Sequence, residues 1–107
     1  MDKNMRNKAY WLVKLFNDCL NETPRKTSVY TEINNMFYDT LMILKDDRKS
    51  YKDGDYALLR LYSRLFHLIG FKTIILSKEE RMCWENLKTF ILGEAHDDLR
   101  AVGGPLV

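Results

Sequence analysis

Apolar side chains recur every three or four positions in four segments of this chain, and polar side chains occupy the positions between them. That period places the apolar side chains along one side of an α-helix, so each segment is predicted to be an amphipathic helix. Phe37 and Leu87 lie near the middle of their patterns and are predicted to be buried. The four predicted stripes consist of Met5, Ala9, Leu12, Val13, Phe16 and Cys19; Tyr30, Ile33, Phe37, Leu41 and Leu44; Leu58, Leu61, Tyr62, Leu65, Phe66 and Ile69; and Cys83, Leu87, Phe90 and Ile91.

Capping and breaking residues set the limits of the first two helices. The first is predicted from about Lys3 to Leu20, because Pro24 in "NETPRKT" disfavours helix at the residue before it. The second starts at Thr27 or Ser28, since either can act as an N-cap, and ends near Asp46.

The third and fourth helices are bounded by similar signals. A polar run with a glycine, "KDDRKSYKDGD", is predicted to be a loop, so the third helix follows Asp53 or Asp55. It should stop at Gly70, because glycine tolerates the left-handed conformation. The fourth helix opens with Ser77 and Glu80 at capping-box spacing and ends between residues 93 and 96.

The stretch "FKTIIL" between the third and fourth helices is rich in β-branched residues, which favour strands. A lone strand has no partner with which to pair. We therefore interpret this stretch as a connection that packs Phe71, Ile74 and Leu76 over one end of the core.

Four helices with short connections predict an all-α protein in which neighbouring helices run antiparallel. The expected architecture is an up-down-up-down four-helix bundle over residues 1–98, with a flexible C-terminal tail over residues 99–107. At 107 residues the chain is long enough for one domain. The tail "LRAVGGPLV" either folds back on the bundle through Leu99 and Val102, engages a partner, or is a disordered terminus.

Composition indicates the cellular compartment of the protein but does not identify the class of its partner. A net charge of +2 is too small to argue for nucleic acid or an anionic membrane, and it excludes neither. Cys19 and Cys83 are too few for a disulfide framework, so we expect two free thiols, close together in the bundle and reduced in the cytoplasm. No apolar run approaches the ~20 residues of a membrane span, and the N-terminal stretch lacks a signal-peptide core.

Motifs that carry catalysis or ligand binding are absent from the sequence. There is no nucleophile motif, glycine-rich phosphate loop or dinucleotide fingerprint. Apart from Asp97 beside His96 and Glu94 two residues before it, neither His67 nor His96 has a cysteine or acidic residue at metal-ligand spacing within a helix turn. The acidic loop lacks the terminal glutamate of a calcium loop. We expect no enzymatic activity, metal, cofactor or small-molecule substrate.

Several exposed side chains are candidates for contact with another macromolecule. Arg60 and Arg64 lie one turn apart on the third helix, and Lys72 follows it. They form either a solvated surface or a contact patch for an acidic or polar partner. Trp84 is expected at the margin of the buried face, where its ring could serve a partner. Three tyrosines lie outside the apolar stripes and are candidate surface anchors for a partner: Tyr10, Tyr38 and Tyr51.

The pattern resembles the immunity proteins of pediocin-like bacteriocins, particularly the enterocin A immunity group. The resemblance is carried by three stretches, "KAYWLVKLFNDCLN", "VYTEINNMFYDTLMILKDDRKSY" and "ALLRLYSRLFHLIGFKTIILSKEE", which together cover most of the chain. It implies a cytoplasmic antiparallel four-helix bundle that protects a bacterium without enzymatic activity. It also implies recognition of the mannose phosphotransferase permease, once a bacteriocin occupies it, from the inner membrane face.

Specificity in that family is associated with the C-terminal half, but the family offers no invariant functional side chain to transfer. Exposure and chemistry within this half indicate the following partner-binding residues: Arg60, Arg64, Lys72, Trp84, Lys88, Arg100 and Leu106. The "GGPLV" ending matches no family tail. Two other functions stay open, a small helical adaptor that binds a soluble protein and a nucleic-acid-binding protein that uses Arg60, Arg64 and Lys72.

Overall fold

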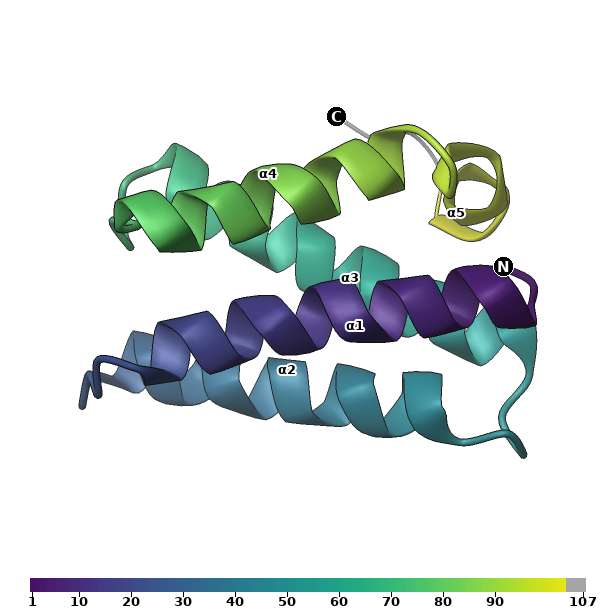
Figure 1. Ribbon diagram of the computed structural model, residues 1–107, viewed down its shortest axis with the longest axis horizontal. Helices are drawn as coiled ribbons and strands as arrows, with labels where there is room; N and C mark the ends of the chain where they lie inside the picture. Colours follow the sequence, from purple (N-terminus) through teal and green to yellow (C-terminus); the bar gives the residue numbers. More distant parts are fainter. Residues whose placement is uncertain (104–107) are drawn as a thin grey trace.

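The protein is all-helical over the part of the chain that the structure describes. A computed structural model describes residues 1–103 and contains no strand there, which confirms the predicted all-α class. Its five helices are α1 (Lys3–Asn21), α2 (Ser28–Lys45), α3 (Tyr51–Gly70), α4 (Lys78–Leu92) and α5 (His96–Gly103) (Figure 1). Residues 71–77 form a connection without regular structure, as predicted for most of "FKTIIL".

Helix α1 lies at the centre of the packing. It contacts α2 along one side and α4 along another, while α3 packs against α2 and α5 (Figure 1). Phe16 of α1 meets Phe37 of α2 edge to face, with ring centroids 5.5 Å apart. Both rings are fully buried, and so is Leu87 of α4. The predicted burial of Phe37 and Leu87 is confirmed. The four stripes form most of the core, and the side chains at the margins of the stripes are partly buried against it.

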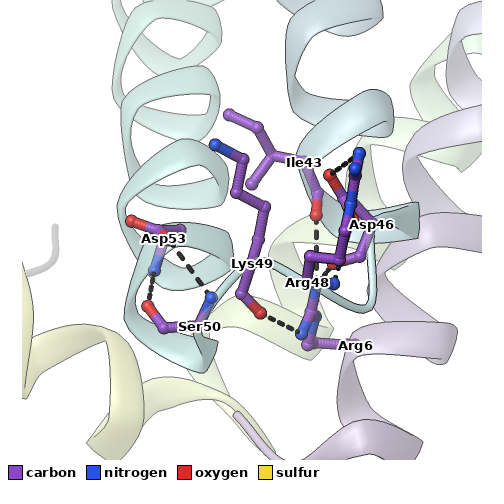
Figure 2. A network of polar contacts seen from close by, with 7 residues as sticks. All are labelled: Arg6, Ile43, Asp46, Arg48, Lys49, Ser50 and Asp53. Atoms are coloured by element: carbon purple, nitrogen blue, oxygen red, sulfur yellow. Dashed lines mark hydrogen bonds and ion pairs between the residues drawn. The ribbon is translucent and has the colours of Figure 1, made fainter.

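A buried arginine ties the end of α2 to α1. The Arg6 guanidinium donates hydrogen bonds to the carbonyl oxygens of Ile43 at 3.1 Å, Asp46 at 2.9 Å and Lys49 at 3.2 Å (Figure 2). Carbonyl groups at a helix C-terminus have no partner within their own helix. Arg6 supplies those partners, and it thereby fixes the turn that leads from α2 into α3.

Helix α3 begins one turn earlier than predicted, because Ser50 and Asp53 form a capping box. The Ser50 hydroxyl accepts from the Asp53 amide at 3.2 Å, and the Asp53 carboxylate accepts from the Ser50 amide at 3.1 Å (Figure 2). Asp55 is therefore no cap. It is buried, and it accepts hydrogen bonds from the Met1 amino group at 2.8 and 3.0 Å. Gly54 lies inside the helix, where a Cβ atom would stand 3.4 Å from Leu44.

The fifth helix was not predicted. Helix α4 ends at Leu92, and α5 starts four residues later, so the expected boundary between residues 98 and 99 falls inside α5. Leu99 is fully buried, which shows that the chain folds back on the bundle there. A short segment with few apolar residues gives too little periodicity to be recognised as a helix. The rest of the expected tail, residues 104–107, lies outside the described residues.

Gly93 makes the turn between α4 and α5 possible. A Cβ atom at this position would stand 2.8 Å from the backbone oxygen of Thr89, closer than such atoms approach one another. Glycine is therefore the residue that lets the chain leave α4 here.

The two cysteines are free and lie close together, as predicted from the arrangement of α1 and α4. Burial first, and the neighbouring Cys83 second, raise the pKa of the Cys19 thiol to about 11. Burial also raises the pKa of Cys83. Both thiols are therefore held in the protonated, less nucleophilic form.

An ion pair joins the loop after α1 to the start of α4. Arg25 donates two hydrogen bonds to the carboxylate of Glu80, at 2.9 and 3.2 Å. The buried Glu80 also accepts from the Ser77 amide at 2.7 Å, which completes the predicted capping box. Burial opposes ionisation of Glu80, but the hydrogen bonds from Arg25 and Ser77 outweigh it and lower the pKa of this carboxyl.

Replacing Arg25 with alanine should lower the free energy of unfolding by about 2–3 kcal/mol at neutral pH. Loss of one partner from a fully buried pair costs about 3–5 kcal/mol, and the Arg25 side chain is 24% exposed, which reduces this value. Because the folded-state pKa of Glu80 is lowered, the pair stabilises the protein above the ordinary carboxyl pKa and stops doing so as the pH falls through the folded value.

Urea unfolding of wild type and Arg25→Ala at neutral pH and at about pH 3 measures this effect. The difference between the two proteins should shrink at the acidic pH. Arg48→Ala is the matched control, because Arg48 pairs with Asp46 through a side chain that is 91% exposed. A difference that stays constant with pH would contradict the assigned role of the pair.

Candidate functional site

A groove opens where the end of α3, the connection that follows it, and the start of α4 come together. Its volume is about 460 Å³. In the part of the chain that the structure describes, its lining consists of Phe66, Ile69, Gly70, Lys72, Ile74, Ile75, Arg81, Trp84, Glu85 and Lys88. We call this hollow the α3–α4 groove.

The bottom of the α3–α4 groove is apolar and firmly held. Trp84 is 3% exposed, and its ring stacks on Tyr62 of α3 with centroids 5.5 Å apart. Ile74, from the connection, is equally buried. Phe66 and Ile69 pack against the core from the last turns of α3. A floor built from core side chains does not collapse when the groove is empty, so the hollow is preformed.

The charged residues around the groove are mostly cationic. Lys88 lies 3.3 Å from the Glu85 carboxylate, one turn away on α4. Lys72 and Arg81 have no ion pair with any residue in the described range 1–103. Three cations and one carboxylate leave the groove with an excess of positive charge, and two of the cations are available to a partner.

Lys72 has an unusual backbone conformation for a lysine. Its φ is 58°, in the left-handed region, and it follows the last residues of α3. The Lys72 amide donates to the Ile69 carbonyl at 3.1 Å, and the Thr73 amide donates to the Leu68 carbonyl at 2.9 Å. This pair of bonds is the Schellman motif, whose left-handed position is usually glycine. Helix α3 stops at Gly70, as predicted, but the predicted reason is wrong, because Lys72 and not Gly70 adopts the left-handed conformation.

Replacing Lys72 with glycine should raise the free energy of unfolding by about 0.5–1 kcal/mol. A side chain in the left-handed region costs about 1–2 kcal/mol, and the substitution removes this cost. The greater conformational freedom of glycine in the unfolded chain offsets part of the gain in stability. Chemical denaturation measures the change. Lys72→Ala is the matched control, because it removes the same charge but keeps the Cβ atom, and it should show no gain.

Two apolar side chains at the groove are largely exposed. Phe71 is 80% exposed and Ile75 is 75% exposed, so the prediction that Phe71 covers the core is wrong. His67 stacks on Phe71 from the last turn of α3, with centroids 6.0 Å apart. Together with the open groove, these side chains form an apolar surface with cations at its edge. Such a surface is typical of a site for another macromolecule.

The structure brings together three of the residues predicted to bind a partner, Lys72, Trp84 and Lys88. The prediction that Trp84 lies at the margin of the buried face is wrong. Its side chain lies in the core, with one part open to the groove. Tyr38 and Tyr51 are exposed, as expected, whereas Tyr10 is partly buried.

Three other predicted residues lie away from the groove. Arg64 is paired with Glu32 of α2 at 2.7 Å, and the hydrogen bond from Arg64 lowers the pKa of that carboxyl. Arg60 lines a separate hollow between α2 and α3. Arg100 is exposed on α5, near the opposite end of the molecule (Figure 1). Leu106 lies outside the described residues.

Sequence reasoning missed Arg81 and Ile75 as residues of the site. Arg81 lies at a helix position whose pattern is typical of an ordinary solvent-exposed surface. Ile75 had a signal that could have been used, because adjacent side chains in an extended stretch point to opposite sides. Since Ile74 is buried, Ile75 had to point outward.

Comparison of the chain with protein-family models, with curated proteins and with solved structures finds no match. Over residues 1–103, none of the helices combines the length and the apolar character needed to cross a membrane. Among the same residues, no three histidine, cysteine or acidic side chains gather where they could hold a metal ion.

Proposed function

We propose that this protein is a bacteriocin immunity protein that uses the α3–α4 groove to recognise its target. The target is the mannose phosphotransferase permease occupied by a pediocin-like bacteriocin, approached from the cytoplasmic side of the membrane. The protein is not an enzyme in this proposal, and it acts by binding.

The observation that carries the proposal is the α3–α4 groove itself. This groove combines an apolar floor with unpaired cations and two exposed apolar side chains. It lies in the C-terminal half of the chain, which is the half associated with specificity in the family that the sequence resembles. Lys72 adds support, because the turn at the end of α3 places this unpaired cation at the groove. The nucleic-acid alternative has less support, because Arg64 is neutralised by Glu32.

The proposal includes a finer topology. Helices α1 to α4 run alternately up and down, and α5 covers one end of them. The contacts of α1 with α2 and α4, and of α3 with α2, support this arrangement, whereas α3 and α4 diverge and contact each other little.

Expression in a bacteriocin-sensitive strain, followed by challenge with a panel of pediocin-like bacteriocins, tests the function. Wild type should raise the inhibitory concentration of at least one member. The double variant Phe71→Ser/Ile75→Ser should reduce that protection by about tenfold or more, since loss of one binding hot spot has an effect of this size.

The matched control is Tyr38→Ser/Met42→Ser, which removes two apolar side chains of similar exposure, 63% and 53%, from α2. It should protect as well as wild type at equal soluble levels. Absence of protection by wild type across the panel would remove the immunity function. Co-purification of a soluble protein with wild type, but not with the Phe71 and Ile75 double variant, would then favour the adaptor function.

A further inference from the structure

The shape of the α3–α4 groove restricts what it can receive. Helices α3 and α4 are joined by a short connection but diverge from it, so they make little contact along their lengths (Figure 1). The groove lies between them at the joined end, open to solvent along one side. Ile75 lines the groove although it is largely exposed, and the exposed Phe71 lies between the lining residues Gly70 and Lys72 in the sequence. An occupant that covers both the hollow and Phe71 is therefore longer than a small molecule.

The backbone around the groove offers little to an extended peptide. The amides of Lys72, Thr73 and Ile74 are already bonded to the carbonyl groups of Ile69 and Leu68 at the end of α3. The described residues also contain no strand whose edge could pair with another chain. An extended segment would bury unpaired backbone groups here, at a cost in free energy. A helix carries its backbone hydrogen bonds with it and needs only side-chain contacts.

The charge of the groove selects among helices. Lys72 and Arg81 are exposed cations without a carboxylate partner in the described chain, whereas Lys88 has Glu85. Carboxylates on an incoming helix would meet two free cations, and cations on it would be repelled. Charge complementarity of this kind favours encounter and excludes wrong partners.

We propose that the α3–α4 groove binds an acidic amphipathic helix of a partner protein. Apolar side chains of that helix enter the groove over Trp84 and Ile74, and carboxylates on its flanks pair with Lys72 and Arg81. The proposal rests on the proposed function of the groove as a partner site, and it specifies the chemistry of the segment that the groove accepts.

A lipid surface is the other macromolecular candidate, since exposed apolar and cationic side chains also occur on membrane-binding proteins. Phe71 and Ile75 could reach a bilayer. Trp84 and Ile74, at 3% exposure, line the bottom of a hollow that a bilayer surface does not enter. A helix uses the floor and the edge together, so it fits the groove better.

Two synthetic helical peptides of about 18 residues test the proposal, a length at which an isolated helix can form. Both have leucine at positions i, i+3, i+4 and i+7. One has glutamates flanking the leucines, the other has lysines in their place, and the remaining positions of both are alanine. Fluorescence anisotropy should show that the glutamate peptide binds the full chain about tenfold or more tightly than the lysine peptide. Nuclear magnetic resonance should show shifts at the Trp84 indole N–H and the amides of residues 70–76.

Charge reversal provides the decisive comparison. Lys72→Glu/Arg81→Glu should invert the preference, so that the lysine peptide binds more tightly. Lys52→Glu/Arg100→Glu makes the same change in net charge away from the groove and should keep the wild-type preference. Circular dichroism checks that both variants fold.

Several results would overturn the proposal. Equal affinity for the two peptides, no binding of either, or shifts centred on Trp11 instead of Trp84 would each do so. Binding to phosphatidylglycerol vesicles that is lost in Phe71→Ser/Ile75→Ser would assign the surface to lipid. The peptide experiment needs no bacteriocin, so its outcome is separate from the immunity test. Protection without a peptide preference refutes the acidic helix alone, and a preference without protection refutes immunity alone.

Discussion

Replacing Phe37 with alanine is expected to lower the free energy of unfolding by about 3–5 kcal/mol. Phe37 is fully buried in α2, and its ring packs edge to face on Phe16 of α1 at 5.5 Å. Truncation removes this aromatic contact and leaves a cavity where α1 and α2 meet. A domain of this size is stable by only about 5–15 kcal/mol, so the loss is a large share of the total.

Urea unfolding followed by circular dichroism measures the effect of Phe37→Ala. Tyr38→Ala is the matched control, because Tyr38 is the next residue on α2 and 63% exposed. It should change the free energy of unfolding by no more than about 0.5 kcal/mol. Similar midpoints for Phe37→Ala and wild type would contradict the assigned face of α2.

Replacing Leu99 with alanine should lower the free energy of unfolding by about 2–5 kcal/mol. Leu99 is fully buried although it lies only a few residues from the end of the described chain. It belongs to α5, which packs against α3 and α4. The residue therefore holds the last helix on the core, and its truncation leaves a cavity at that end of the bundle.

Leu92→Ala is the matched control for Leu99→Ala, because it makes the same chemical change at the end of α4, where the side chain is 41% exposed. Its effect should be smaller by about 1 kcal/mol or more. Thermal and urea unfolding of both variants make the comparison. Equal stability of Leu99→Ala and wild type would show that α5 is not part of the folded core.

The burial of Leu99 also changes the stability expected of a truncated chain. If the four predicted stripes closed the core alone, a chain that stops at Asp98 would keep its helicity. With Leu99 inside the core, that chain should instead lose stability by an amount similar to Leu99→Ala. A test of the residues beyond the bundle therefore has to keep α5 intact.

Local signals in the sequence determined most of the helical structure. The apolar period around Phe37 and Leu87 identified their buried faces, because a helix that packs on one side repeats every 3.6 residues. Ser77 and Glu80 located the start of α4, because their capping bonds form between residues three apart. The same kind of signal lies at Ser50 and Asp53, within a polar run whose glycine favours a loop.

The candidate site was predicted only in part. Lys72, Trp84 and Lys88 were selected from the sequence, and they line one groove. Arg64 was selected on the same grounds, but it pairs with Glu32, a residue 32 positions away. Whether an exposed cation is free or paired depends on which helix lies beside it, and the sequence pattern does not contain this information.

The sequence by itself determined the existence of four of the five helices in the described chain and which side of each of these four is buried, because both depend on residues within a few positions of one another. Only the tertiary structure decided the rest. It placed Leu99 in the core, left Phe71 outside it, and put Lys72 in the left-handed region at the end of α3. These outcomes depend on how α3, α4 and α5 meet in space, where each element is positioned by contacts between distant parts of the chain.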